Sequence, residues 1–120
     1  MEDQILKHLY DIGEAASAII RFVRGKTYDD YEDDELLRSG VERKFEIIGE
    51  ALNRINKDDP GVFGKIRERR SIVSFRNYLA HGYDRIDDRI VWGIVEEDIG
   101  NLLEDVENLI RAHDRTSGCT

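Results

Sequence analysis

Apolar residues recur at steps of three and four along most of the chain, a spacing that places them on one face of an α-helix. The first of these segments predicts a helix from about Asp3 to Arg24, which Gly25 ends. The second predicts a helix from about Asp34 to Asn56. The side chains expected to form its buried stripe are Leu37, Val41, Phe45, Ile48, Leu52 and Ile55.

The segment Lys26 to Asp34 between these helices is predicted to be a polar loop. Asp33 or Asp34 can cap the next helix, because a carboxylate there accepts hydrogen bonds from the unpaired N–H groups of the first turn. Tyr28 and Tyr31 could make surface contacts, but a loop tyrosine more often packs its ring on a neighbouring helix.

The second half of the chain begins with a predicted turn at Lys57 to Gly61, where two aspartates, a proline and a glycine follow one another. A short helical segment is expected at Val62 to Arg67. A third helix is predicted to start near Arg70 or Ser71 and to stop around Gly82, because glycine can adopt the left-handed conformation that ends helices.

A long last helix is predicted to run to about Ala112, entered through Asp87 and Asp88. Its apolar stripe is expected to contain Ile90, Val91, Ile94, Val95, Ile99, Leu102, Leu103, Val106, Leu109 and Ile110. We interpret residues 1–113 as one helical domain and residues 114–120 as a flexible C-terminal tail.

Amphipathic helices with short connections predict an all-α fold, an antiparallel four-helix bundle with an additional short helix. Apolar positions on the first and last helices are numerous enough to cover the core and still leave a surface for a second copy. We therefore expect a homodimer.

Length and composition limit the alternatives. A chain of 120 residues can bury one core. No apolar run approaches the roughly 18 residues needed to cross a bilayer, and the acidic start Met1-Glu2-Asp3 lacks the basic residues of a signal peptide. We therefore expect a cytoplasmic protein without membrane contact. The single cysteine, Cys119, has no partner for a disulfide or a metal site.

The net charge of −8 argues against a nucleic-acid partner, because phosphate contacts need basic surface. Six basic and two acidic residues between positions 64 and 86 give that segment +4 and leave −12 for the rest of the chain. This basic stripe coincides with a polar segment from Ser74 to Asp87. For Arg67 to Arg70 taken alone, a solvated helix face is the usual explanation.

Glu46 and Glu50 lie one helical turn apart on the second helix, a spacing that suits a carboxylate pair for metal binding or acid–base chemistry. Di-iron bundles also need Glu-x-x-His pairs, and this sequence contains none. We therefore expect no metal site and no cofactor. The pair is interpreted as surface charge, or alternatively as a contact that supports the polar segment.

Within the polar segment, Arg76, Asn77, His81 and Tyr83 offer a permanent cation, an amide, a group that titrates near neutrality and a phenol. Asn77 and His81 share a helix face, whereas Arg76 lies about 140° around the axis from His81. Arg76 must then act through its long side chain or from a symmetry-related copy. Simpler explanations are a helix-end cap for the histidine, a surface ion pair for the arginine and ordinary packing for the tyrosine.

Residues 76–83, Arg-Asn-Tyr-Leu-Ala-His-Gly-Tyr, match the Arg-x4-His-x-Tyr signature of HEPN proteins. They closely resemble the HepT branch, toxins that are paired with the minimal nucleotidyltransferase MntA. Residues 41–52 resemble the second-helix motif of the family, and Tyr83-Asp84 followed by Val91-Trp92 resembles its approach to the last helix. The resemblance covers most of the chain.

The resemblance implies a four-helix bundle dimer whose two motifs meet at the interface, and metal-independent cleavage of RNA, with tRNA as one candidate substrate. It implies that Arg76 and His81 are catalytic and that Asn77 supports them. These roles suit the residue types. A neutral histidine can accept a proton from a 2′-hydroxyl or a water and return it to the leaving oxygen. An arginine holds phosphate charge in the transition state.

The resemblance also implies that an MntA-like nucleotidyltransferase antitoxin transfers AMP from ATP to Tyr83, in a type VII-like toxin–antitoxin system. The added phosphate would compete with RNA for Arg76. One alternative is a non-catalytic helical module that binds a nucleotide or docks a nucleotidyltransferase. Another is a metal-dependent bundle enzyme, which the missing Glu-x-x-His disfavours.

Overall fold

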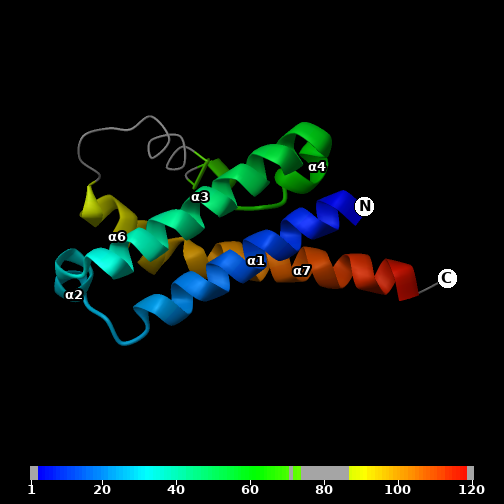
Figure 1. Ribbon diagram of the computed structural model, residues 1–120. Coiled ribbons are helices and arrows are strands. Elements are labelled where there is room, and N and C mark those ends of the chain that lie inside the picture. Colours follow the sequence, from blue (N-terminus) through cyan, green and yellow to red (C-terminus); the bar gives the residue numbers. More distant parts are fainter. Residues whose placement is uncertain (1–2, 71, 74–86, 119–120) are drawn as a thin grey trace.

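A computed structural model of the chain describes residues 3–70, 72–73 and 87–118, and for residues 114–118 it describes the backbone only (Figure 1). Within these ranges the chain forms helices and no strands. The helices are α1 (Asp3–Val23), α2 (Tyr28–Asp33), α3 (Glu35–Asp58), α4 (Pro60–Phe63), α6 (Asp88–Glu97) and α7 (Ile99–Gly118). The predicted all-α helical bundle is confirmed.

The long helices pack along one another around α1, which contacts both α3 and α7. Figure 1 shows that α1 runs in the opposite direction to both of these helices, so the predicted antiparallel arrangement is observed. Helices α2 and α6 lie together where α1 ends, and α4 lies near the N-terminus. No helix in the described part of the chain has both the length and the apolar composition that crossing a membrane requires.

One hydrophobic core joins the apolar stripes of these helices. Most apolar positions on these stripes are buried, and the residues at most 1% exposed are Ile5, Leu9, Ile12, Ile19, Val41, Phe45, Ile48, Leu52, Ile55, Val91, Ile99, Leu102 and Val106. The prediction is wrong for Ile90, which is 53% exposed, and Leu37, Ile94, Leu103 and Ile110 are only partly buried. Burial of each such large apolar side chain contributes about 1.5–3 kcal/mol to folding. Packing of these stripes is therefore the main force that fixes the helices in place.

Several helix ends follow the predicted signals. Gly25 adopts a φ of 74° just beyond α1, a conformation that favours glycine. The Asp34 carboxylate accepts a hydrogen bond from the Leu37 N–H at 3.0 Å and caps α3. The Asp87 carboxylate likewise accepts one from the Arg89 N–H at 2.9 Å and caps α6. These caps satisfy N–H groups that have no partner within their helices.

The predicted loop between the first two helices is wrong over Tyr28–Asp33, which forms α2. The Thr27 hydroxyl accepts a hydrogen bond from the Asp30 N–H at 3.2 Å, and the Thr27 N–H donates to the Asp30 carboxylate at 2.9 Å. This reciprocal capping starts the helix. Tyr31 then anchors α2, because its side chain is completely buried. The expectation that a tyrosine of this segment packs its ring on a neighbouring helix is confirmed for Tyr31, which contacts Trp92 of α6.

The predicted turn at Lys57 to Gly61 is also wrong in part, because α3 continues through Asp58 and α4 begins at Pro60. Asp59 joins the two helices, and its carboxylate accepts a hydrogen bond from the Val62 N–H at 3.2 Å. Proline is tolerated at the start of a helix because the N–H that it lacks would be unpaired there. The short helix therefore starts earlier than predicted and ends at Phe63.

The last helix was predicted to be continuous, but Asp98 divides it into α6 and α7. Hydrogen bonds from the Asp98 N–H to the Ile94 carbonyl, 2.9 Å, and from the Leu102 N–H to the Asp98 carbonyl, 3.0 Å, continue through the junction. The change of helix lets α6 contact α2 while α7 contacts α1. Continuous apolar spacing hides this break. Helix α7 extends to Gly118, beyond the predicted end near Ala112.

Only the beginning of the predicted third helix lies within the described residues. The Ile72 N–H donates to the Glu68 carbonyl at 3.2 Å, a helical hydrogen bond. The Ile72 side chain is completely buried. The predicted end at Gly82 lies outside the described residues.

Candidate functional site

The four predicted site residues, Arg76, Asn77, His81 and Tyr83, all lie outside the residues that the structure describes. Their roles therefore stay predictions. What the structure does define is the chain on either side of the segment, residues 65–70 and 72–73 before it and Asp87 with α6 after it.

The leading side is anchored to α7 through Arg67 and Asp105. The Arg67 backbone N–H donates to the Asp105 carboxylate at 2.9 Å, and the guanidinium donates to both carboxylate oxygens at 3.0–3.2 Å. Burial alone would raise the pKa of Asp105. Hydrogen bonds from Arg67 outweigh this effect and hold the pKa below its usual value. The Asn101 amide adds a second link by donating to the Glu68 carboxylate at 3.3 Å.

The same hydrogen bond to Asp105 raises the pKa of Arg67. Arg67 also lies 3.5 Å from the Glu104 carboxylate. The positive charge of Arg67 is thus paired with carboxylates of the protein itself. The predicted solvated helix face is therefore wrong for Arg67, which lies in a turn and pairs with carboxylates of α7.

After the segment, the start of α6 is held by an aromatic pair between α2 and α6. The ring centroids of Tyr31 and Trp92 are 5.4 Å apart and the rings are tilted by 40°. Val91 beside Trp92 is completely buried. The Val91-Trp92 part of the family resemblance is therefore a packing element that holds the start of α6. Arg89 adds a further contact, with its guanidinium 4.6 Å from the Tyr28 ring centroid.

A small group of ionisable side chains surrounds this aromatic pair. Burial raises the pKa of Tyr31, and the negative charges of Glu42 and Asp88 raise it further. Burial, followed by repulsion from Asp88, raises the pKa of the half-buried Glu42, and Arg38 partly opposes this. The Tyr31 hydroxyl has no hydrogen-bond partner in the described structure. Glu42 therefore holds its proton more readily than an ordinary glutamate.

Sequence reasoning missed this group, although Glu42 lies inside the segment that resembles the second-helix motif. The available signal was its position between Val41 and Phe45, both completely buried. A carboxyl group next to a buried stripe is prone to desolvation, which raises its pKa. Glu42 can therefore donate or accept a proton close to the start of α6.

Glu46 and Glu50 instead take part in exposed ion pairs along α3. Glu46 lies 3.2 Å from Arg43, and Glu50 lies 3.1 Å from Arg54. Their interpretation as surface charge is confirmed. Among the described residues, no group of three or more His, Cys, Asp or Glu side chains is placed to hold a metal ion.

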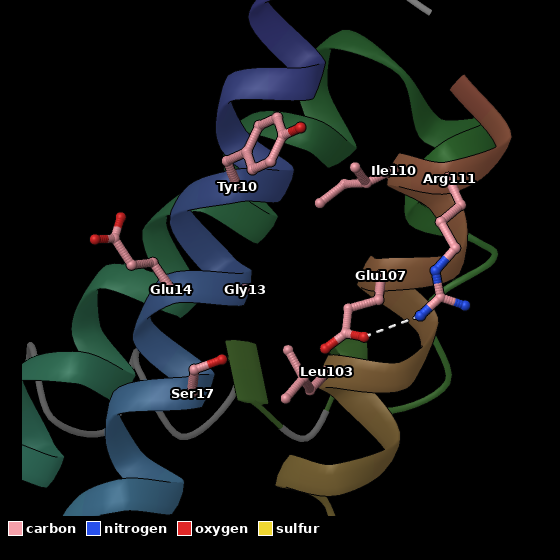
Figure 2. Close-up of a pocket in the computed structure, with 8 residues that line it drawn as sticks. All are labelled: Tyr10, Gly13, Glu14, Ser17, Leu103, Glu107, Ile110 and Arg111. Atoms are coloured by element: carbon pink, nitrogen blue, oxygen red, sulfur yellow. Dashed lines mark hydrogen bonds and ion pairs between the residues drawn. The ribbon is translucent and has the colours of Figure 1, made fainter. Parts of the chain in front are cut away.

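A groove of about 450 Å³ separates α1 from α7 on the surface. Figure 2 shows Tyr10 on α1 facing Ile110 on α7, with Gly13 and Leu103 further along the groove. The ion pair between Glu107 and Arg111, 3.2 Å, lies along the α7 edge. Tyr10 remains 51% exposed. The first and last helices thus carry the free apolar surface that the sequence predicts.

Comparison with known proteins places this bundle in a family. The family model described as Ribonuclease HepT-like matches residues 12–109. A Methanocaldococcus jannaschii protein named as a putative RNase is 37% identical over 99 residues, which cover 82% of this chain and 90% of the relative. A Thermococcus cleftensis protein named as a probable ribonuclease HepT is 35% identical over 102 residues, covering 85% and 92%. No solved structure is significantly similar. The chain belongs to the HepT-like ribonuclease family.

Proposed function

We propose that this protein is a metal-independent endoribonuclease toxin in which Arg76 and His81 are catalytic and Asn77 supports them. The observation that carries the proposal is the family match over residues 12–109, which spans the whole Arg-x4-His-x-Tyr segment. Relatives at 35–37% identity are named as ribonucleases. The residue types in the segment supply a proton carrier and a fixed cation.

In the proposed reaction, neutral His81 accepts the proton of a ribose 2′-hydroxyl, and the oxygen attacks the adjacent phosphorus. The bond from phosphorus to the 5′-oxygen breaks, and a protonated histidine supplies the proton to that oxygen. Arg76 cannot lose its proton and donates two hydrogen bonds to the phosphate as charge accumulates in the transition state. Asn77, one helical turn from His81, orients the imidazole or the phosphate.

A second copy of the chain completes the site in this proposal. On the predicted helix, Arg76 and His81 would be about 140° apart around the axis, so one copy alone would present them to different sides. Two motifs that meet across a dimer interface bring an arginine and a histidine together and double the local positive charge. The apolar groove between α1 and α7 supports an association between copies, because exposed apolar surface favours burial.

Control of the activity is assigned to Tyr83. A partner nucleotidyltransferase of the MntA type transfers AMP from ATP to the phenol oxygen and releases pyrophosphate. The new phosphodiester places a negative charge next to Arg76 and fills the space that RNA would occupy. The pair would then act as a type VII-like toxin–antitoxin system, with the nucleotidyltransferase as antitoxin.

The proposed function is tested by incubating purified protein with total RNA in the presence of EDTA. We expect cleavage by the natural sequence and a loss of about 10²-fold or more in His81→Ala, in line with the contribution of general acid–base groups. Circular dichroism of the variant checks that it remains folded. A folded His81→Ala protein that cleaves RNA at the original rate contradicts the proposal. Cleavage that EDTA abolishes contradicts the metal-independent mechanism.

A further inference from the structure

We propose that a basic pocket formed by the end of α3, by α4 and by Arg69, Arg70 and Val73 binds a phosphate of the RNA strand that runs into the active site. This inference rests on the proposed ribonuclease function and extends it. The pocket has a volume of about 530 Å³, and Asn56, Phe63, Arg69, Arg70 and Val73 are among the residues that line it. No acidic residue lines it within the described part of the chain. The local chemistry therefore favours an anion.

Arg69 is held at the wall of this pocket by two contacts. Its guanidinium donates a hydrogen bond to the Ile66 carbonyl at 2.7 Å and lies 5.7 Å from the centroid of the Phe63 ring. A guanidinium has five N–H donors, so most of them remain for a ligand. Because the side chain is already positioned, binding a phosphate costs less conformational entropy than it would for a free arginine.

Arg70 differs from its neighbour Arg67 in the same basic stripe. Arg67 is paired with Asp105 at 3.0 Å, whereas Arg70 is exposed and forms no ion pair within the described structure. An unpaired arginine keeps its full charge for a partner. Arg69 and Arg70 therefore give the pocket two cations, a local positive charge that can attract a polyanion although the chain has a net charge of −8.

Chain connectivity sets an upper limit on the distance from this pocket to the catalytic segment. Arg70 precedes Arg76 by only six residues, and six residues span at most about 20 Å. A strand whose reacting phosphate is held by Arg76 thus has another phosphate within reach of the pocket. The contact involves the backbone of the strand, so we expect it to strengthen binding of single-stranded RNA regardless of sequence.

The test measures binding separately from cleavage. The probe is a fluorescent single-stranded oligoribonucleotide in which 2′-O-methyl groups block cleavage, and its affinity is measured by anisotropy at several salt concentrations. The variants are Arg70→Ala, Arg70→Lys and Arg69→Ala with Arg70→Ala. Arg21→Ala is the matched control, because Arg21 is an exposed arginine in the last turn of α1, at the far end of that helix from α4.

For the double variant we expect affinity to fall about tenfold or more at low salt, and the slope of log K against log salt to decrease by about 1. Arg70→Lys retains most of the binding and Arg21→Ala stays within about twofold of the natural protein. Unchanged affinity and salt slope in the double variant overturn the inference. Displacement of the oligonucleotide by an equal concentration of ATP also overturns it, because the site would then prefer free nucleotide.

Failure of this inference differs from failure of the proposed function. If the natural protein cleaves RNA and the double variant binds the probe normally, the pocket assignment fails and the ribonuclease proposal stands. If the probe binds through Arg69 and Arg70 but no RNA is cleaved, the pocket assignment stands and the ribonuclease proposal fails.

Discussion

Arg67 and Asp105 lie 38 residues apart in the sequence, yet the Asp105 carboxylate accepts hydrogen bonds from both the backbone and the guanidinium of Arg67 at 2.9–3.2 Å. The Asp105 side chain is only 13% exposed. The contact therefore fixes the chain to α7 a few residues before the predicted catalytic segment begins.

Asp105→Ala is expected to lower the free energy of unfolding by about 1–3 kcal/mol, because it removes charge-assisted hydrogen bonds and leaves a backbone N–H unpaired. Urea denaturation at neutral pH measures this. Glu104→Ala is the matched control. Its carboxylate is 66% exposed and lies 3.5 Å from Arg67, so the expected change is within about 0.5 kcal/mol. Equal losses of unfolding free energy in the two variants would show that the hydrogen bonds to Asp105 add no stability beyond that of an exposed ion pair.

The same contact predicts a dependence on pH. The pKa of folded Asp105 is lowered, so the stability that it contributes is present above the pKa of the unfolded chain and is lost as the pH falls through the folded value. The difference in stability between the natural protein and Asp105→Ala should therefore shrink on acidification. A difference that grows as the pH falls would contradict the assignment.

Tyr31→Phe is expected to leave the protein as stable or slightly more stable, because the hydroxyl that it removes is buried without a partner in the described structure. Tyr31→Ala also removes the ring that contacts Trp92, and we expect it to cost about 3–5 kcal/mol. Thermal and chemical unfolding of both variants measure these changes. A loss greater than about 1 kcal/mol in Tyr31→Phe would reveal a hydrogen bond to that hydroxyl.

Glu42→Gln is expected to make unfolding free energy less sensitive to pH. The pKa of folded Glu42 is raised by burial and by Asp88, so its favourable contribution is complete below the unfolded pKa and is lost as the pH rises through the folded value. Glutamine has no such loss, so the variant should gain stability relative to the natural protein as the pH rises from 4.5, the ordinary pKa of a glutamate, toward neutrality. A constant difference over this range would exclude a raised pKa.

Tyr83→Phe separates catalysis from control. A phenylalanine lacks the oxygen that accepts AMP, so the variant should keep ribonuclease activity and resist a cognate nucleotidyltransferase supplied with ATP. Mass spectrometry detects the addition of AMP to the natural protein, and the cleavage assay follows its silencing. Modification of Tyr83→Phe at the original level would place the acceptor at another residue.

Much of the scaffold could be predicted from local signals. Helical spacing located the buried stripes, and Gly25, Asp34 and Asp87 act at the helix ends as their side chains predict. Local signals failed where tertiary packing decides. The acidic segment around Tyr31 has the composition of a loop. Its one buried ring packs on Trp92, which is distant in the sequence, so the local pattern does not indicate a helix.

The candidate site divides in the same way. Its four residues follow from the spacing of a motif and from family resemblance, and the family match includes them. The features that flank it join residues distant in sequence, such as Arg67 with Asp105 and Tyr31 with Trp92. No periodic pattern encodes such pairs. The pocket beside Arg69 likewise depends on how α4 packs against the end of α3.

The most direct test of a site shared between two copies is a mixing experiment with Arg76→Ala and His81→Ala proteins. Each variant alone should be inactive. After the two are unfolded, mixed and refolded together, mixed dimers contain one site with both natural residues if each site takes its arginine and histidine from different copies. We predict that RNA cleavage returns in the mixture and stays absent in either variant treated alone. A mixture that forms dimers but remains inactive would contradict the shared site.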